Sequence, residues 1–313
     1  MCYKDIIFFK ECVKVNKVIK LLAMGVLGTG MQQAQATSIV FDYGYDSNSF
    51  FDTQAKKDVL EAAGSFFSSR LNDSLSAIDS AGNNHFNANF SNPGVTGSTV
   101  TINDFNVAAN TLTVFAGGRA IAGSTIGIGG PGGYGASGSQ AFFDSFDRGQ
   151  ADVGTTDFAP WGGAITFDTG ALWYFDSDVS TVESFSGNDF YSVAIHELGH
   201  LLGIGTADSW DNLVSSGSFI GSASNAVYGG DVPLHLDDSH WADGTMSLVD
   251  AQDAQDVAMG PSITTGTRKY FTDLDLAGLT DVGWEVSAVP VPAAVYFFGS
   301  ALLGLGAFRK KSK

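Results

Sequence analysis

Cysteine is almost absent from this chain of 313 residues, which contains only Cys2 and Cys12. Both lie upstream of the point where we expect a signal peptide to be removed. The processed chain would therefore contain no cysteine. Its fold cannot depend on disulfides, although the chain is expected to be exported.

Basic residues are also scarce. The chain has 16 Lys and Arg against 33 Asp and Glu, and its formal net charge is −17. Such a surface repels nucleic acid and anionic membranes, so we expect no nucleic-acid partner. We interpret the acidity as a source of solubility, and Ca²⁺ binding by some of the Asp residues is left open without assigned ligands. With 44% hydrophobic and 16% charged residues, the composition is that of a folded globular protein.

The first 36 residues have the organisation of a signal peptide. Three lysines (Lys14, Lys17 and Lys20) precede an apolar run over residues 21–28, and residues 34–36 read Ala-Gln-Ala. A basic segment, an apolar segment and a small-x-small cleavage site in this order predict export and a processed chain that begins at Thr37.

The last 25 residues form a second distinct segment. Residues 289–292 read Val-Pro-Val-Pro, residues 293–308 are apolar or small, and residues 309–313 are strongly basic. We expect a hydrophobic helix with a cytoplasmic basic end, which would be the only part of the chain in contact with a membrane.

This tail resembles the PEP-CTERM sorting signals of Gram-negative bacteria, with Val291 in place of the usual Glu. The resemblance implies transient anchoring of the tail in the inner membrane and recognition by an exosortase-type sorting enzyme. It also implies a final location at the cell surface or outside the cell.

Residues 37–288 show no repeat and no long linker, and we interpret them as one domain. Residues 53–75 have apolar positions at helical spacing, and a second helix is expected to begin at Asn188 or Asp189 and to end at Gly203. Residues 117–139 are rich in Gly and Ser and are expected to form a loop. The G-x-G-x-x-G match at residues 127–132 does not indicate a dinucleotide site, because Pro131 and Gly132 prevent a helix from starting there. Strands are expected at residues 38–43, 98–102, 111–115 and 164–168.

The second of these helices carries the most informative motif, His196-Glu197-Leu198-Gly199-His200, followed by Gly203. Histidines four residues apart lie on one face of a helix, where they can bind a single Zn²⁺. Glu197 follows the first ligand and can act as a general base on a zinc-activated water. The motif predicts a zinc-dependent peptidase.

A catalytic zinc needs a third protein ligand, and several residues are candidates. In the pattern H-E-x-x-H-x-x-G-x-x-H the third histidine would occupy position 206, which is a threonine here. Among the other histidines, His240 is preferred and His235 competes with it, while nothing around His85 marks a ligand. A carboxylate could also serve, and the candidates are Asp208, Asp237 and Asp238.

The pair His240-Trp241, followed by Met246, resembles the leishmanolysin-like metzincins, in which an insertion separates the third ligand from the first two. The resemblance implies that His240 is the third ligand and that Met246 forms the Met-turn under the metal. Residues 161–175 resemble the edge-strand region of matrixins. Residues 273–284 resemble the closing helix of secreted bacterial metallopeptidases.

These resemblances imply an α+β fold of the zincin type, with a twisted mixed sheet, an active-site helix, a Met-turn and a C-terminal helix near residues 274–282. Residues 210–232 are expected to form a loop inserted before His240. The implied function is that of an exported zinc endopeptidase acting on proteins or peptides. Two alternatives remain: a catalytically inactive surface or matrix adhesion protein with a structural zinc, and a zinc hydrolase that cleaves an ester or a glycan-linked amide.

Overall fold

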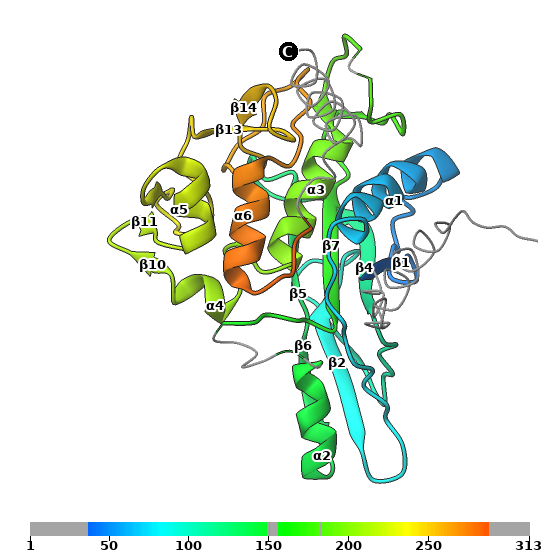
Figure 1. Ribbon diagram of the computed structural model, residues 1–313. Coiled ribbons are helices and arrows are strands. Elements are labelled where there is room, and N and C mark those ends of the chain that lie inside the picture. The colour runs from blue at the N-terminus through cyan, green and yellow to red at the C-terminus, as the bar shows by residue number, and fades with distance from the viewer. Residues whose placement is uncertain (1–36, 149, 151–155, 182, 288–313) are drawn as a thin grey trace, which may run out of the picture. The chain divides into compact units, whose positions relative to one another are not determined.

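The computed structural model describes residues 37–148, 150, 156–181 and 183–287 (Figure 1). The predicted signal peptide (residues 1–36) and the predicted sorting signal (residues 289–313) lie outside the described residues. No helix in the described part of the chain has both the length and the apolar composition needed to cross a bilayer.

The main sheet has the strand order β1-β4-β7-β5. Strands β1 (Ser38–Asp42), β4 (Thr111–Arg119) and β7 (Gly162–Asp168) are parallel, whereas β5 (Gly127–Pro131) pairs antiparallel with β7 at the edge. Most residues of β4 and β7 are buried, as expected for parallel strands covered on both faces. This mixed sheet agrees with the α+β class predicted from the sequence.

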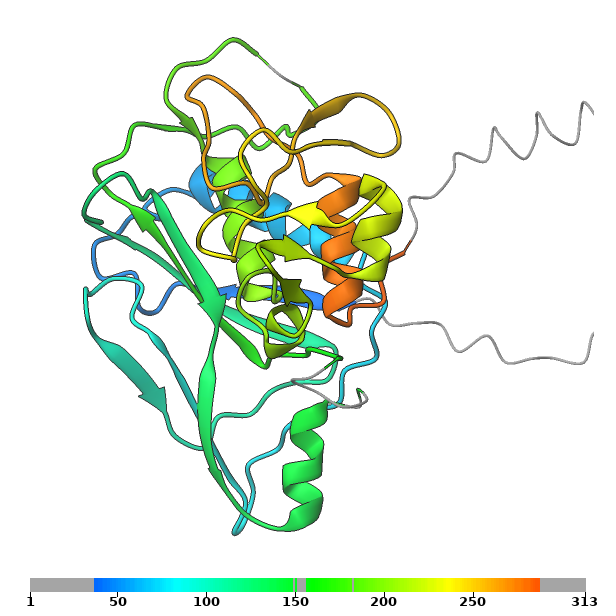
Figure 2. The same ribbon diagram turned by 90° about the vertical axis from the view of Figure 1, so that its left-hand side faces the viewer.

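Two helices, α1 (Gln54–Ser68) and α3 (Phe190–Leu201), pack against each other and against this sheet (Figure 2). Helix α3 contacts both β5 and β7. The predicted helix over residues 53–75 is too long, because α1 ends at Ser68. Leu71 and Leu75 remain fully or almost fully buried beyond that end, so the apolar spacing continues after the helix has stopped.

A second sheet, of order β3-β2-β6, has its own aromatic core. It consists of β2 (His85–Ser91), β3 (Thr99–Ile102) and β6 (Gly133–Ser137), and is followed by the short helix α2 (Gln140–Phe143) and a 3₁₀ turn (Asp144–Asp147). The expectation of a loop over residues 117–139 is therefore wrong. Most of that segment forms the end of β4 and strands β5 and β6, with Gly132 between the last two strands.

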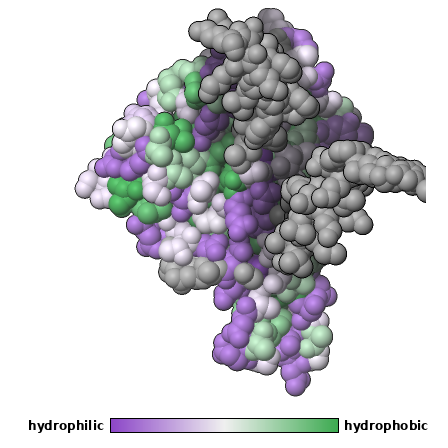
Figure 3. Space-filling view, viewed as in Figure 1, coloured by the Kyte–Doolittle hydropathy of each residue, from purple (hydrophilic) through white to green (hydrophobic). Residues whose placement is uncertain are grey.

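The C-terminal part of the described chain consists of short elements around α6 (Asp273–Val282), which lies in the range where the sequence predicts a helix. Residues 210–232 were expected to form a loop, but they include defined secondary structure, and α5 (Ser222–Tyr228) contacts α6. Apolar and polar surface alternate over the α5 segment (Figure 3). The remaining elements are β8 (Trp173–Tyr174), β9 (Asn188–Asp189), α4 (Asp208–Asp211), β10 (Val214–Ser215), β11 (Ser218–Phe219), β12 (Val232–Pro233), β13 (Met246–Leu248) and β14 (Ala254–Asp256).

Candidate metal centre

Helix α3 places two histidines one turn apart. Its N-cap is Asp189, whose carboxylate accepts a hydrogen bond from the backbone N–H of Ser192 at 3.1 Å. Eleven of its twelve residues are buried, and His196 is only partly buried. The helix ends before Gly203, which has a φ of +112°, a left-handed conformation that glycine adopts without strain.

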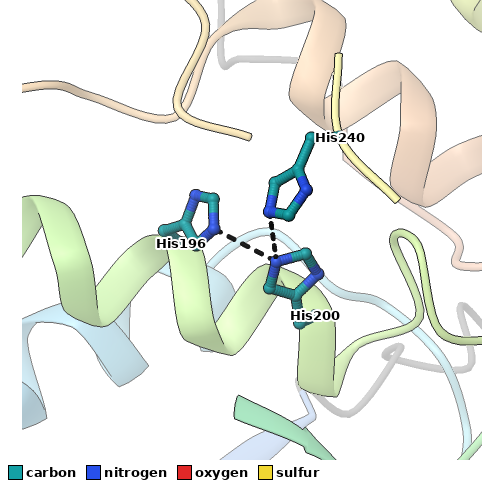
Figure 4. Close-up of side chains that lie close together, drawn as sticks. All are labelled: His196, His200 and His240. Carbon is teal, nitrogen blue, oxygen red and sulfur yellow. Dashed lines mark hydrogen bonds between the residues drawn. The ribbon is translucent and has the colours of Figure 1, made fainter. Parts of the chain in front are cut away.

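The third histidine comes from a segment 40 residues further along the chain. Nε2 of His200 lies 3.1 Å from Nε2 of His196 and 3.1 Å from Nε2 of His240 (Figure 4). Trp241, next to His240, is fully buried against Trp210 and Phe219, and this aromatic cluster fixes the start of the segment. The structure thus brings together the three histidines that the sequence analysis preferred.

The other ring nitrogen of each histidine faces an oxygen that can only accept a hydrogen bond. Nδ1 of His196 lies 2.8 Å from the carbonyl oxygen of Ala258, and Nδ1 of His200 lies 2.8 Å from that of Ile204. Nδ1 of His240 lies 2.9 Å from Oδ2 of Asp237. Each Nδ1 is therefore placed to donate its proton, and in the neutral form of each ring the lone pair of Nε2 faces the other two rings.

Electrostatics favour the neutral form of His196 and His200. Burial and the neighbouring His200, with smaller effects of His240 and Lys269, hold the pKa of His196 well below its usual range. Burial and the neighbouring His240 lower the pKa of His200 to about 4. Three unprotonated nitrogens that face one another repel unless a cation lies between them. This donor set therefore fits a divalent metal ion.

The spacing of the nitrogens also fits such an ion. Two imidazole nitrogens bound at about 2.0–2.1 Å in a tetrahedral arrangement lie roughly 3.3–3.4 Å apart. The two separations of 3.1 Å are close to that value. Three histidines leave the fourth position of a tetrahedral site open for water or substrate, as in catalytic zinc sites.

Glu197 lies at the same site and is 5% exposed. Burial raises the pKa of its carboxyl to about 8, although a hydrogen bond from the backbone of Gly129 opposes the shift. A Cβ atom on Gly127 would clash with Oε1 of Glu197, and a Cβ atom on Gly129 would clash with the backbone carbonyl oxygen of Glu197. The glycines of β5 therefore allow this edge strand to approach the metal-site helix closely.

These groups line a cleft of about 730 Å³. The segment 124–129, which includes the start of β5, forms one part of its wall, and the segment 258–263, except Met259, forms another. His196, Glu197, His200 and His240 all face this cleft. A ligand that enters it meets the three histidine nitrogens and a carboxyl group with raised proton affinity, the combination that metal-assisted hydrolysis requires.

The competing ligand candidates lie outside the triad. His235 lines the cleft, but its Nδ1 lies 3.2 Å from Asp237, and Asp237 itself faces Nδ1 of His240. Burial raises the pKa of Asp237, but hydrogen bonds from Ser239 and His240 outweigh this effect and lower it to about 2. Asp237 is thus a carboxylate that orients His240. In the described residues His235, Asp237 and His240 also lie close enough together to hold an ion, but this second group shares His240 with the triad. His85, Asp208 and Asp238 belong to neither group.

The methionine expected beneath the metal lies elsewhere. Met246 is 50% exposed on β13, whereas Met259 is fully buried. A Cβ on Gly199 would clash with Sδ of Met259, so this thioether lies against α3 at the residue that precedes His200. Met259, and not the predicted Met246, is therefore the methionine that packs against the histidine helix.

One buried carboxylate connects the parts of the site. Asp275, near the start of α6, accepts hydrogen bonds from Nε1 of Trp241 at 2.9 Å and from the backbone N–H groups of Ala258 (2.9 Å) and Met259 (3.1 Å). It also forms a capping box with Thr272. Asp275 thereby links the neighbours of His240 and the carbonyl partner of His196.

Comparison with known proteins finds similarity to metallopeptidases. Residues 134–238 match the family model of the matrixins, so the match covers the histidine helix and ends two residues before His240. A segment of 48 residues is 46% identical to Metalloendoproteinase 1 of Glycine max and covers 15% of this chain. The chain spans only 16% of the length of that plant protein. No solved structure matches.

The two matches show that part of this chain is similar to metallopeptidases, and the matrixin match includes the histidine helix. Both agree with the chemistry of the three-histidine site.

Proposed function

We propose that this chain is an exported zinc-dependent endopeptidase. The observation that carries the proposal is the convergence of three histidine Nε2 atoms, with Nε2 of His200 lying 3.1 Å from each of the other two, in a cleft that also contains the carboxyl of Glu197. His196, His200 and His240 would hold the ion. The bound zinc supplies Lewis-acid chemistry that activates water and polarises the scissile carbonyl.

In this proposal Glu197 accepts the proton of the attacking water and passes it to the leaving amine. Burial suits the carboxyl to this role, because it raises the pKa toward the neutral range in which a general base works well. The N–H of Gly129 fixes the direction of the carboxylate. Met259 supplies an apolar, polarisable floor beneath the histidines that does not compete for the ion.

Export rests on the sequence of the two ends of the chain. The signal peptide predicted at residues 1–36 and the PEP-CTERM-like tail at residues 289–313 are the basis for proposing delivery to the cell surface or the medium, with processing by an exosortase-type enzyme. The scarcity of cysteine in the rest of the chain is compatible with this route.

The test is cleavage of a diverse peptide library by the zinc-loaded chain and by its Glu197→Gln variant. We expect cleavage by the wild type, loss of cleavage on chelation, and a fall of at least about 10³-fold in kcat for the variant at unchanged zinc content. A variant that cleaves at the wild-type rate would refute the role of Glu197. A zinc-loaded wild type that cleaves no peptide would favour the inactive adhesion protein or a hydrolase for another bond.

A further inference from the structure

Lys269 is a cation at the wall of the cleft. Among the described residues that line the cleft it is the only Lys or Arg, in a chain with a net charge of −17. Its side chain reaches the wall formed by residues 258–263, where Nζ donates to the carbonyl oxygens of Ser262 at 2.9 Å and Val257 at 3.3 Å. The residue is 8% exposed, so its charge is largely removed from bulk water.

This charge has no counter-ion in direct contact. No ion pair in the described residues includes Lys269, and Asp243, Asp256 and Asp275 act on it only from a greater distance. An ammonium group has three N–H donors, and the two carbonyls use two of them. A largely buried cation with a spare donor is costly unless an anion completes its surroundings.

The ammonium lies close to the metal site. Val257, one of its acceptors, precedes Ala258, whose carbonyl oxygen receives Nδ1–H of His196. The backbone of Lys269 is fixed to α3 by Ser192, which exchanges hydrogen bonds with its N–H at 2.7 Å and its carbonyl oxygen at 3.2 Å. An anion bound at Nζ would therefore lie next to the segment whose Ala258 holds the ring of His196.

A purely structural role would require only the two hydrogen bonds to the carbonyls. A neutral amide could supply both, because its NH₂ group has two donors, and it would avoid the cost of burying a charge. A residue that only holds the segment from Val257 to Ser262 in place needs neither a positive charge nor a third donor. They suit a site that receives an anion from the cleft.

We propose that Lys269 binds a carboxylate of the substrate, so that the cleft selects peptides with an acidic group close to the scissile bond. This inference rests on the proposed peptidase function. The carboxylate can come from an Asp or Glu side chain or from the free C-terminus of the peptide. Both sources present the same chemistry to the ammonium, and suitably capped peptides distinguish them.

The experiment compares matched peptides that differ only by Glu or Gln at each position around the cleaved bond, with amidated C-termini. The zinc-loaded full chain is expected to show a kcat/KM at least tenfold higher for Glu than for Gln at one position. In Lys269→Gln, which keeps neutral donors for the two carbonyls, this ratio should fall toward one. The matched control is Lys57→Gln, because Lys57 lies on α1 outside the cleft, its Nζ lies over the ring of Tyr43, and the change in net charge is the same. The control should keep the wild-type ratio.

The ratio is informative even where the variant is damaged, because structural damage lowers both rates. A wild-type ratio near one at every position, and no gain when a free carboxylate replaces the C-terminal amide, would overturn the proposal but leave the peptidase intact. A high ratio that survives Lys269→Gln would also overturn it. If a gain appears only with the free C-terminal carboxylate, the ligand is the chain end.

Absence of all turnover would refute the proposed function separately. The recognition of a carboxylate can still be measured as binding of the same peptides to zinc-loaded Glu197→Gln by calorimetry. The proposal is supported if Glu197→Gln binds the Glu peptide more tightly than the Gln peptide and if this difference is lost in the double variant Glu197→Gln/Lys269→Gln. Equal affinities for the two peptides contradict it.

Discussion

The indole N–H of Trp241 donates to Oδ1 of the buried Asp275 at 2.9 Å. Trp241 follows the metal-site histidine His240, and the same carboxylate accepts the backbone N–H groups of Ala258 and Met259. A single side chain on α6 thus positions both the segment that carries His240 and the segment that holds the ring of His196.

Asp275→Asn should weaken metal binding. Both carboxylate oxygens of Asp275 accept hydrogen bonds from N–H groups. In the variant the NH₂ group of the asparagine replaces one of these oxygens and faces donors that it cannot accept from, so the segments around Trp241 and Ala258 should shift. Changes to groups that orient metal ligands cost about 10–100-fold in metal affinity, and we expect a loss in this range by chelator competition. Asp273→Asn is the control, since Asp273 lies on the same helix and contacts the backbone of Ala251 instead. Equal zinc affinities for Asp275→Asn and the wild type would show that Asp275 does not act on the site.

Asp237→Asn should affect the site through His240 alone. The carboxylate accepts Nδ1–H of His240 at 2.9 Å and so fixes the ring and its tautomer. An asparagine can hold the ring less strongly and can present its NH₂ group instead, and we expect zinc affinity to fall by about 10-fold or more. Asp238→Asn is a close control, because Asp238 has a φ of +56° that asparagine tolerates. Similar losses in both variants would contradict a specific role for Asp237.

The close approach of β5 to Glu197 gives a prediction that separates catalysis from metal binding. Gly127→Ala places a methyl group against Oε1 of Glu197 and should displace the carboxylate. We expect kcat to fall by about 10²-fold or more at full zinc content, because positioning of the general base is lost. In Gly130→Ala, on the same strand, the added Cβ has no atom within 4 Å, and activity should remain near wild type. The measurement is steady-state kinetics with zinc analysis, and equal kinetics for the two variants would be evidence against this packing constraint.

Asp73, outside the cleft, gives a prediction about stability and pH. It is fully buried, Oδ2 has no hydrogen-bond partner, and burial raises its pKa to about 6 despite hydrogen bonds from Glu285 N–H and Gln150. In the unfolded chain the pKa is near 3.9. The folded state therefore favours the protonated form, and the stability that Asp73 contributes is fully present below about pH 4 and is lost as pH rises through about 6.

Asp73→Asn does not titrate, so its stability relative to the wild type should improve between pH 5 and pH 8. The gain should reach at most about 3 kcal/mol over the full range, from a pKa difference of about two units. Urea unfolding of both proteins at the two pH values measures this difference. A constant difference between them would show that Asp73 keeps a normal pKa in the folded chain.

The sequence could predict the part of the site that depends on local spacing. His196 and His200 meet because four residues make one helical turn, and the pair His240-Trp241 marked the distant ligand. Met259 could not be found in this way, since a single methionine carries no pattern and only the folding of residues 246–259 decides which methionine is buried. Asp275 resembles an ordinary residue of a helix N-terminus, and its hydrogen bonds across the site exist only in the tertiary structure.

The strands likewise divide into those that the sequence predicts and those that depend on tertiary structure. Alternating or apolar runs such as those of β1 and β7 were predictable from composition. Strand β5 was interpreted as loop because glycines have no side chains that reveal a period of two. Its conformation is imposed from outside, by pairing with β7 on one edge and by the nearby helix α3, against which only glycine fits at positions 127 and 129.

The distribution of the histidines along the chain has a consequence for the protein as a whole. Two ligands lie in α3, which packs on the main sheet, and the third follows a stretch of 39 residues that includes α4 and α5. An ion bound by all three acts as a cross-link that closes this stretch into a loop and lowers the entropy of the unfolded chain. Removing the metal should therefore loosen residues 201–239 first, and proteases should cut the metal-free chain there before they reach the sheet.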